Sequence, residues 1–227
     1  MMPAENRPIF APALALLRKD ALAERRGRTA LHASVLFAVT AIVAMAFCLG
    51  ATPVPGKVQA SILWVILFFA ATAGLARAFV AEEESGTALA LRLSGPARAV
   101  LLGKLLANLA LLVALEAVVL PLFCVLMQPP IGNWPGFIAV LLLGTLALAS
   151  AATLAAALVA KARGRGELFA GIAFPLLVPG LAGAIVGTQA CLVGARGGVM
   201  GPLQGLLSYD GLLLTVGFLV FEALWEE

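Results

Sequence analysis

The residues of this 227-residue chain that could perform acid–base chemistry are few. Glu116 lies inside the apolar run LLVALEAVVLPLF, and Asp210 interrupts another apolar run near the C-terminus. A bare carboxylate is costly in such a setting, so Glu116 should be protonated, hydrogen-bonded or directed at a helix partner or a polar cavity. Pro121 frees a backbone carbonyl near Ala117 that could supply part of this polarity. A substrate-path residue and a polar contact between subunits are both open interpretations of Glu116.

No catalytic constellation accompanies these carboxylates. The sequence shows neither a nucleophile–base pair nor a metal-ligand cluster beside them, which argues against a membrane enzyme or a carboxylate-based carrier. His32, the only histidine, stands at the start of an apolar segment and is interpreted as interfacial rather than as a haem ligand. Cys48, Cys124 and Cys191 have no CxxC spacing and are expected to be packed apolar residues, with a disulfide near the outer face left open.

The sequence also lacks a phosphate-binding motif. Gly103-Lys104 resembles the end of a P-loop, but no glycine stands five residues before Gly103, and Leu105 follows where Ser or Thr is needed. Any ATP hydrolysis must therefore come from another chain. This chain is expected to be non-catalytic by itself and to bind no cofactor or metal directly.

The composition is that of an integral membrane protein. Hydrophobic residues make up 62% of the chain and charged residues 12%, and the mean hydropathy is +1.05. Soluble domains carry about a quarter charged residues, and a segment of about 20 apolar residues can cross a bilayer as a helix. Six such segments predict an all-α membrane fold: Leu31–Leu49, Val58–Val80, Leu105–Met127, Gly136–Ala160, Leu168–Leu192 (a kinked helix with two prolines) and Leu206–Trp225.

The basic residues predict the orientation. Of the 15 Lys and Arg residues, all but Lys57 and Arg196 fall in the N-terminal arm, the region around Val80–Lys104, or Lys161–Arg165. The positive-inside rule places these segments and both termini in the cytoplasm. The net charge of +3 is therefore topological and indicates no nucleic-acid partner.

The chain is divided into a cytoplasmic arm, residues 1–29, and a six-span domain, residues 30–227. In the arm, one helical stripe is apolar and most cations lie outside it, which predicts an amphipathic helix on the inner leaflet. The stripe consists of Phe10, Ala13, Leu14, Leu17 and Ala21. A disordered basic tail is the alternative, because prolines stand at positions 8 and 12. The last outer loop, Gly194–Gly205, is predicted to be irregular or re-entrant.

A polar insert, VAEEESGTALALRLSGPARAVLLGK (Val80–Lys104), would lie on the cytoplasmic side between the second and third spans. Its acidic start favours the positive end of a short helix, and Gly95-Pro96 ends that helix. Arg98 and Lys104 are then expected at headgroup level, where long cationic side chains snorkel. A rigid handle for a soluble partner and a solvated hairpin without a partner both agree with these residues.

The order of motifs resembles ABC export permeases and, more specifically, the cytochrome c maturation permeases of the haem exporter protein B family. The matching features are ILWVILFFAATAGLARAF (Ile62–Phe79), Gly86, Pro96, LGKLLAN, Pro121, LLLGT (Leu141–Thr145) and KARGRGELFAGIAFPLLVPGL (Lys161–Leu181). Two expected carboxylates are missing. Ala76 stands where a glutamate would precede Arg77, and GTALAL contains no acidic residue.

The resemblance implies a coupling helix at about Glu82–Ser94, in a loop at about residues 81–99, that docks on an ATPase subunit. The expected docking residues are Glu82, Glu83, Glu84, Gly86, Leu89 and Arg92, with Lys161, Arg163 and Arg165 as a second cytoplasmic contact.

The resemblance also implies a location in the bacterial inner membrane and a set of partners. These are a cytoplasmic ABC ATPase that uses ATP, a haem-handling membrane subunit (CcmC-like), a small single-span subunit (CcmD-like) and a periplasmic haem chaperone (CcmE-like). Haem would be carried by the other subunits, and ATP hydrolysis would drive release of the haem-loaded chaperone. A permease for another cargo, such as a lipid, a polysaccharide or a small molecule, is the alternative.

Overall fold

The structure, a computed structural model, describes residues 10–27, 29–50, 53–75, 96–160, 165–192 and 198–226. The regular elements in these residues are all α-helices, which confirms the all-α prediction for this part of the chain. They are α1 (Phe10–Gly27), α2 (Thr29–Leu49), α3 (Gly56–Leu75), α6 (Ala97–Met127), α7 (Trp134–Ala160), α8 (Arg165–Leu192) and α9 (Met200–Glu226).

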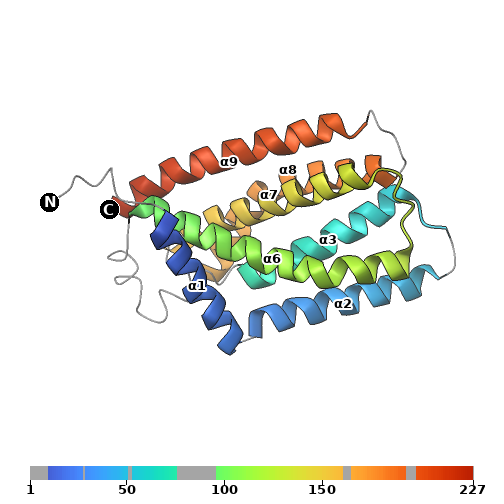
Figure 1. Cartoon of the computed structure of the whole chain (residues 1–227), viewed down its shortest axis with the longest axis horizontal. Helices are drawn as coiled ribbons and strands as arrows, with labels where there is room; N and C mark the ends of the chain where they lie inside the picture. Colours follow the sequence, from blue (N-terminus) through green and yellow to red (C-terminus); the bar gives the residue numbers. More distant parts are fainter. Residues whose placement is uncertain are drawn as a thin grey trace.

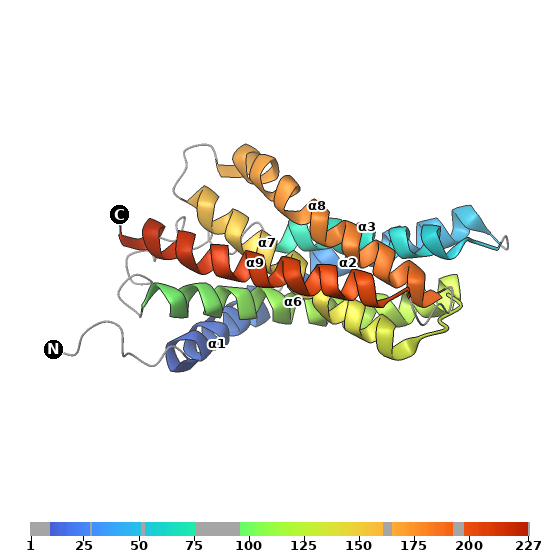
Figure 2. The same cartoon turned by 90° about the horizontal axis from the view of Figure 1, so that it is seen from above.

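Helices α2, α3, α6, α7, α8 and α9 run up and down along one common direction, whereas α1 crosses the beginning of α6 at an angle (Figures 1 and 2). The beginning of α6 and the end of α9 lie at the same end of the bundle as α1. The basic segments were predicted to lie on one side of the membrane. Their described parts lie at one end of the bundle, which agrees with that prediction. Which side of the membrane this end faces stays a prediction.

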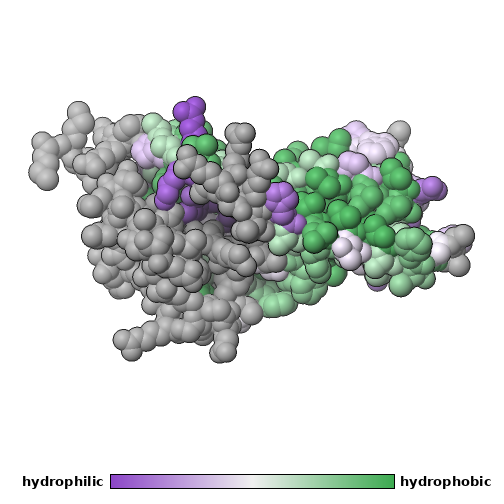
Figure 3. All heavy atoms as spheres, turned by 90° about the horizontal axis from the view of Figure 1, so that it is seen from below, coloured by the Kyte–Doolittle hydropathy of each residue, from purple (hydrophilic) through white to green (hydrophobic). Residues whose placement is uncertain are grey.

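Five of the helices are long and apolar enough to cross a membrane: Leu31–Leu49, Ala97–Met127, Trp134–Val159, Ala173–Leu192 and Met200–Ala223. The predicted span Val58–Val80 coincides with α3, whose apolar part Gly56–Ala70 is shorter than these five, and residues 76–80 lie outside the described residues. A sixth span thus stays a prediction. Figure 3 shows a broad hydrophobic surface with hydrophilic side chains toward its ends, as a bilayer requires.

Two helices begin six or more residues before the starts predicted from the sequence. Helix α6 starts at Ala97, directly after the extended Pro96, so Arg98 and Lys104 belong to the helix and not to a loop that precedes it. Helix α9 starts at Met200, so the prediction of an irregular or re-entrant Gly194–Gly205 is wrong from residue 200 onward. Both predictions were late because the charged residues at the start of α6 and the glycines at the start of α9 were interpreted as loop residues. The first turns of a helix accept both residue types. Helix α8 continues through both of its prolines, as predicted.

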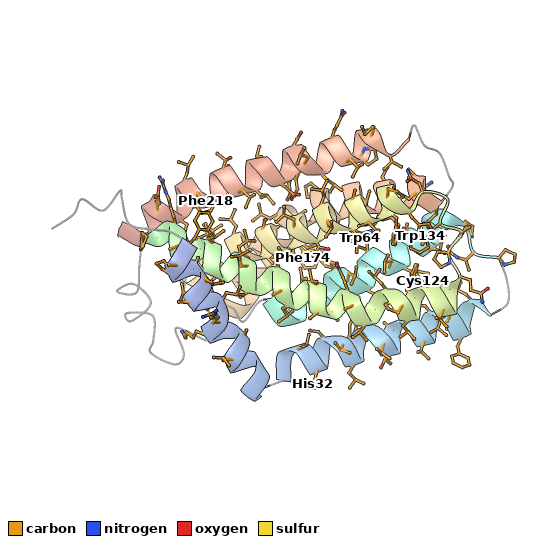
Figure 4. All side chains as sticks on the ribbon, viewed as in Figure 1. His32, Trp64, Cys124, Trp134, Phe174 and Phe218 are labelled. Carbon is orange, nitrogen blue, oxygen red and sulfur yellow. The ribbon has the colours of Figure 1, made fainter. Side chains whose placement is uncertain are left out.

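Helix α7 forms the centre of the bundle and contacts α3, α6, α8 and α9. Its buried surface consists largely of alanines, which allow neighbouring helices to approach closely in a membrane. Trp64 of α3 packs on Gly144, where a Cβ atom would lie 2.2 Å from the indole ring. The Trp64 Nε1–H donates to Thr188 Oγ1 of α8 at 2.8 Å, so this side chain joins three helices (Figure 4).

Candidate functional site

The residues predicted to dock an ATPase belong to two cytoplasmic segments, and most of them lie outside the described part of the chain. Glu82, Glu83, Glu84, Gly86, Leu89, Arg92, Lys161 and Arg163 lie outside the described residues, and Arg165 is the first residue of α8. The structure does describe the point at which the polar insert enters the bundle. We call this segment, Ala97–Lys104 at the beginning of α6, the loop root.

The loop root is bound to α1 by a buried ion pair. Lys104 Nζ donates to Asp20 Oδ2 at 2.9 Å, and the exposed fractions of the two side chains are 3% and 20%. The prediction that Lys104 snorkels to the headgroups is therefore wrong, because α1 covers this side chain. A buried ammonium group needs such a partner to compensate for lost hydration.

Close backbone packing accompanies this ion pair. A Cβ atom at Gly103 would lie 2.9 Å from Leu16 Cβ and 3.1 Å from the carbonyl oxygen of Ala13. Helix α1 thus rests directly on the backbone of α6, and only glycine allows this approach. Ala13 and Leu16 are buried against α6, whereas Phe10 and Leu14 of the predicted apolar stripe are exposed. A helix is present in the arm, but its amphipathic character and its position on a lipid leaflet stay predictions.

A second ion pair joins the loop root to α9. Arg98 donates through Nε to Glu222 Oε1 and through Nη2 to Glu222 Oε2, the latter at 3.0 Å. This two-point geometry orients both side chains. Because the Arg98 side chain is 56% exposed, solvent screens the pair, and it contributes less than about 1 kcal/mol. The loop root is thus held by a buried contact on one side and by an exposed contact on the other.

Glu116 lies at the α6–α7 interface, where it is buried and its Oε1 is hydrogen-bonded to Thr145 Oγ1. Thr145 Oγ1 also lies 2.7 Å from the carbonyl oxygen of Leu141. A hydroxyl has one hydrogen and cannot donate to two acceptors. Both contacts are satisfied when a neutral Glu116 carboxyl donates to Thr145, which in turn donates to Leu141. Thr145 of the facing helix therefore supplies polarity to Glu116, and a contribution from the carbonyl freed by Pro121 stays a prediction.

A second polar pair repeats this arrangement. Asn108 Nδ2 donates to Thr153 Oγ1 at 2.8 Å. Asn108 and Glu116 are eight residues apart on α6, as are Thr145 and Thr153 on α7, so the two pairs are separated by about 12 Å along antiparallel helices. Asn108 and both threonines were not among the candidate residues predicted from the sequence. Their matched spacing of eight residues was the signal that could have revealed them.

Asp210 is 2% exposed, and neither of its carboxylate oxygens has a hydrogen-bond partner among the described residues. The neighbouring Tyr209 donates to the carbonyl oxygen of Leu176 in α8. Asp210 is therefore not hydrogen-bonded to Glu116. Within the described ranges no group of three or more His, Cys, Asp or Glu residues could hold a metal ion.

The remaining candidate residues lie apart from one another. His32 is exposed near the start of α2 (Figure 4). The cysteines are free thiols, so no disulfide joins them. Cys191 is buried and Cys124 half-buried, as expected, but the prediction that Cys48 is packed is wrong, because Cys48 is exposed on α2. Cys48 is part of an apolar run, so hydropathy could not distinguish it from a packed residue.

The comparisons with known proteins agree with this architecture. The family model described as CcmB protein matches residues 11–222, which include the seven described helices except the first residue of α1 and the last four of α9. A search of curated proteins finds no match.

Proposed function

This chain belongs to the CcmB family, and from this membership we propose that it is the subunit through which a partner ATPase drives haem handling in cytochrome c maturation. The family makes it a multi-pass inner-membrane component of a haem-export ABC system, a class of permease subunit that is generally non-catalytic. The apolar helices and the lack of a nucleotide-binding motif in the sequence agree with this role.

The polar insert Val80–Lys104 is the proposed coupling element. It would dock on the ATPase through Glu82, Glu83, Glu84, Gly86, Leu89 and Arg92, with Lys161, Arg163 and Arg165 as a second contact. The loop root supports this assignment, because a force on the insert enters α6 at Pro96. Helix α6 has 31 residues and is about 46 Å long, so it can carry a displacement through the bundle.

The contacts of α6 determine which helices would follow such a displacement. The Lys104–Asp20 pair connects α6 to α1, and the Arg98–Glu222 pair connects it to α9. The Asn108–Thr153 and Glu116–Thr145 pairs connect it to α7. An ATPase cycle would thus move α6 together with α1 and would change the contacts of α6 with α7 and α9.

The proposed outcome of this movement is the release of a haem-loaded periplasmic chaperone (CcmE-like). Haem would be held by a haem-handling membrane subunit (CcmC-like), assisted by a small single-span subunit (CcmD-like), and ATP would be bound by the ATPase. On this view the chain needs no haem ligand of its own, and His32 has no catalytic role. The family match is the main support for this function. The contacts of the loop root suggest how a movement of the insert would reach the other helices.

Purification of the tagged chain in mild detergent from its own host tests the proposal. An ATPase subunit should co-purify, and deletion of the chain should abolish c-type cytochromes on a haem-stained gel. The triple variant Glu82→Lys, Glu83→Lys, Glu84→Lys should lose the ATPase, whereas Glu5→Lys in the N-terminal arm should retain it. Normal ATPase binding by the triple variant contradicts the docking assignment, and normal c-type cytochromes after deletion contradict the function.

A further inference from the structure

Helix α8 contains a segment in which the regular backbone hydrogen bonds are interrupted twice. Proline has no N–H group, so Pro175 and Pro179 leave the carbonyl oxygens of Gly171 and Pro175 without their usual helical donors. Residues four apart lie on one face of a helix, and both prolines are exposed on that face. Sharp bends of helices occur mostly at such positions. We call residues 171–179 the proline segment.

Tyr209 of α9 contacts α8 at this segment. Its hydroxyl donates to the carbonyl oxygen of Leu176, which lies between the two prolines. Its ring lies on Gly180, where an added Cβ atom would come within 3.1 Å of Tyr209 Cε1. In a regular helix the amide of Gly180 donates to the carbonyl oxygen of Leu176. Tyr209 therefore contacts both residues of the helical turn that includes the second proline.

After the proline segment, α8 lies directly against α9. A Cβ atom added at Gly183 would lie 3.1 Å from Leu206, and one added at Gly187 would lie 3.3 Å from Pro202. Such a close approach of two helices in a membrane depends on small residues at the interface. The part of α8 from Gly180 onward is therefore packed on α9.

Toward its beginning, α8 lies apart from α9 (Figure 2). Gly171 is exposed, and a Cβ atom added there would have nothing within 4 Å. Phe174 contacts α3 instead, through Phe68, with the two ring centroids 5.5 Å apart. Tyr209 thus makes its contact at the point where the two helices separate.

We propose that the proline segment is a hinge in α8 and that Tyr209 is the latch that holds this hinge closed. When the Tyr209 hydroxyl leaves the Leu176 carbonyl, residues 165–174 move relative to α9, while the later part of α8 stays packed on α9. The hinge gives the ATPase a second route into the bundle, because Arg165 belongs to its second proposed contact. This coupling rests on the proposed function, whereas the latch itself does not.

Distances between spin labels in the purified complex test the latch. The labels are placed at Gly171 and Leu219, which are exposed on α8 and α9, in a chain whose native cysteines are replaced by serine. Tyr209→Phe keeps the ring on Gly180 and removes the donor. Without nucleotide, it should raise the ratio of open to closed populations about fivefold, as expected for the loss of one hydrogen bond. An unchanged distance distribution would overturn the proposal.

Thr215→Val is the matched control on α9. It also removes a hydroxyl group, but this hydroxyl donates within its own helix, to the carbonyl oxygen of Gly211 at 2.7 Å. The distance distribution should stay unchanged, and a change as large as that of Tyr209→Phe would overturn the assignment of the latch. Hydrogen exchange needs no labels or cysteine replacements. In the Tyr209→Phe complex the amides of residues 169–174 should exchange about fivefold faster, and an unchanged rate would overturn the proposal.

Proline substitutions test the coupling of the hinge to the ATPase. The double variant Pro175→Ala, Pro179→Ala restores both backbone donors, so ATP-driven chaperone release should fall at least fivefold while the ATPase stays bound. Pro135→Ala is the control, because Pro135 is exposed in the first turn of α7, where no helical hydrogen bond needs its amide. Wild-type release by the double variant would overturn the second route. Absence of an ATPase from the wild-type complex would contradict the proposed function and not the latch, which is measured without nucleotide.

Discussion

The two ends of α6 differ in how they are held. At the loop root, α6 contacts α1 and α9 through two ion pairs and through direct packing on Gly103. At the other end α6 stops at Gln128, whose backbone is left-handed with φ 44°, and an open cleft separates α6 from the end of α2. There the Gln59 side chain reaches across to the Met127 carbonyl. The loop root, on which the ATPase is proposed to act, is therefore held by contacts with two helices. The other end of α6 lies beside open space.

The largest expected effect comes from the buried ion pair. Lys104→Met leaves the Asp20 carboxylate partly buried without its cation, and loss of one partner from a buried pair costs about 3 kcal/mol. Thermal unfolding of the purified protein in detergent should show this loss. The double variant Asp20→Asn, Lys104→Met should recover most of the stability, because it removes both charges. Equal stability of wild-type and Lys104→Met proteins would show that the clamp is not energetically important.

Gly103→Ala tests the backbone packing at the loop root. The new methyl group meets Leu16 Cβ and a backbone oxygen of α1, and such overpacking costs about 2 kcal/mol. Gly201→Ala is the matched control at the opposite end of the bundle, where nothing lies within 4 Å of the added Cβ. It should be neutral or slightly stabilising, since alanine favours a helix. A similar loss of stability in the Gly103→Ala and Gly201→Ala proteins would show that close packing at the loop root is not the cause of the effect.

The polar pairs between α6 and α7 should have an intermediate effect. Thr145→Val removes the partner of Glu116 and should lower the free energy of unfolding by about 1 kcal/mol. Glu116→Gln keeps a donor and an acceptor, so assembly and the yield of c-type cytochromes should be unchanged. Loss of activity in a fully assembled Glu116→Gln complex would instead support a substrate-path role that requires the carboxyl group.

The smallest effect is expected at the exposed side of the loop root. Arg98→Gln removes the contact with Glu222 and should change the free energy of unfolding by less than about 1 kcal/mol, because solvent screens this pair. High salt should lower the free energy of unfolding of the wild-type protein by a similarly small amount. A loss as large as that of Lys104→Met would show that the two sides of the loop root are equally important.

The sequence predicted the helices well, because hydropathy is a local property. The helices at Leu31–Leu49 and Gly136–Ala160 were recognised from composition alone. Glu116 in the third span was recognised as unusual. The partners of charged residues could not be predicted in this way. Asp20 and Lys104 are 84 residues apart, and the snorkelling prediction for Lys104 failed because it assumed lipid where α1 lies. Contacts between distant segments depend on packing, which no local pattern contains.

The most direct test of the account measures coupling in the Lys104→Met complex. Bound ATPase subunit is determined by quantitative gel, and ATP-driven release of the haem-loaded chaperone is followed by haem absorbance. We expect the ATPase to stay bound while release falls at least tenfold. We also expect the double variant Asp20→Asn, Lys104→Met to recover at least half of the stability without recovering release. Release at the wild-type rate from an intact Lys104→Met complex would contradict a coupling path through the loop root.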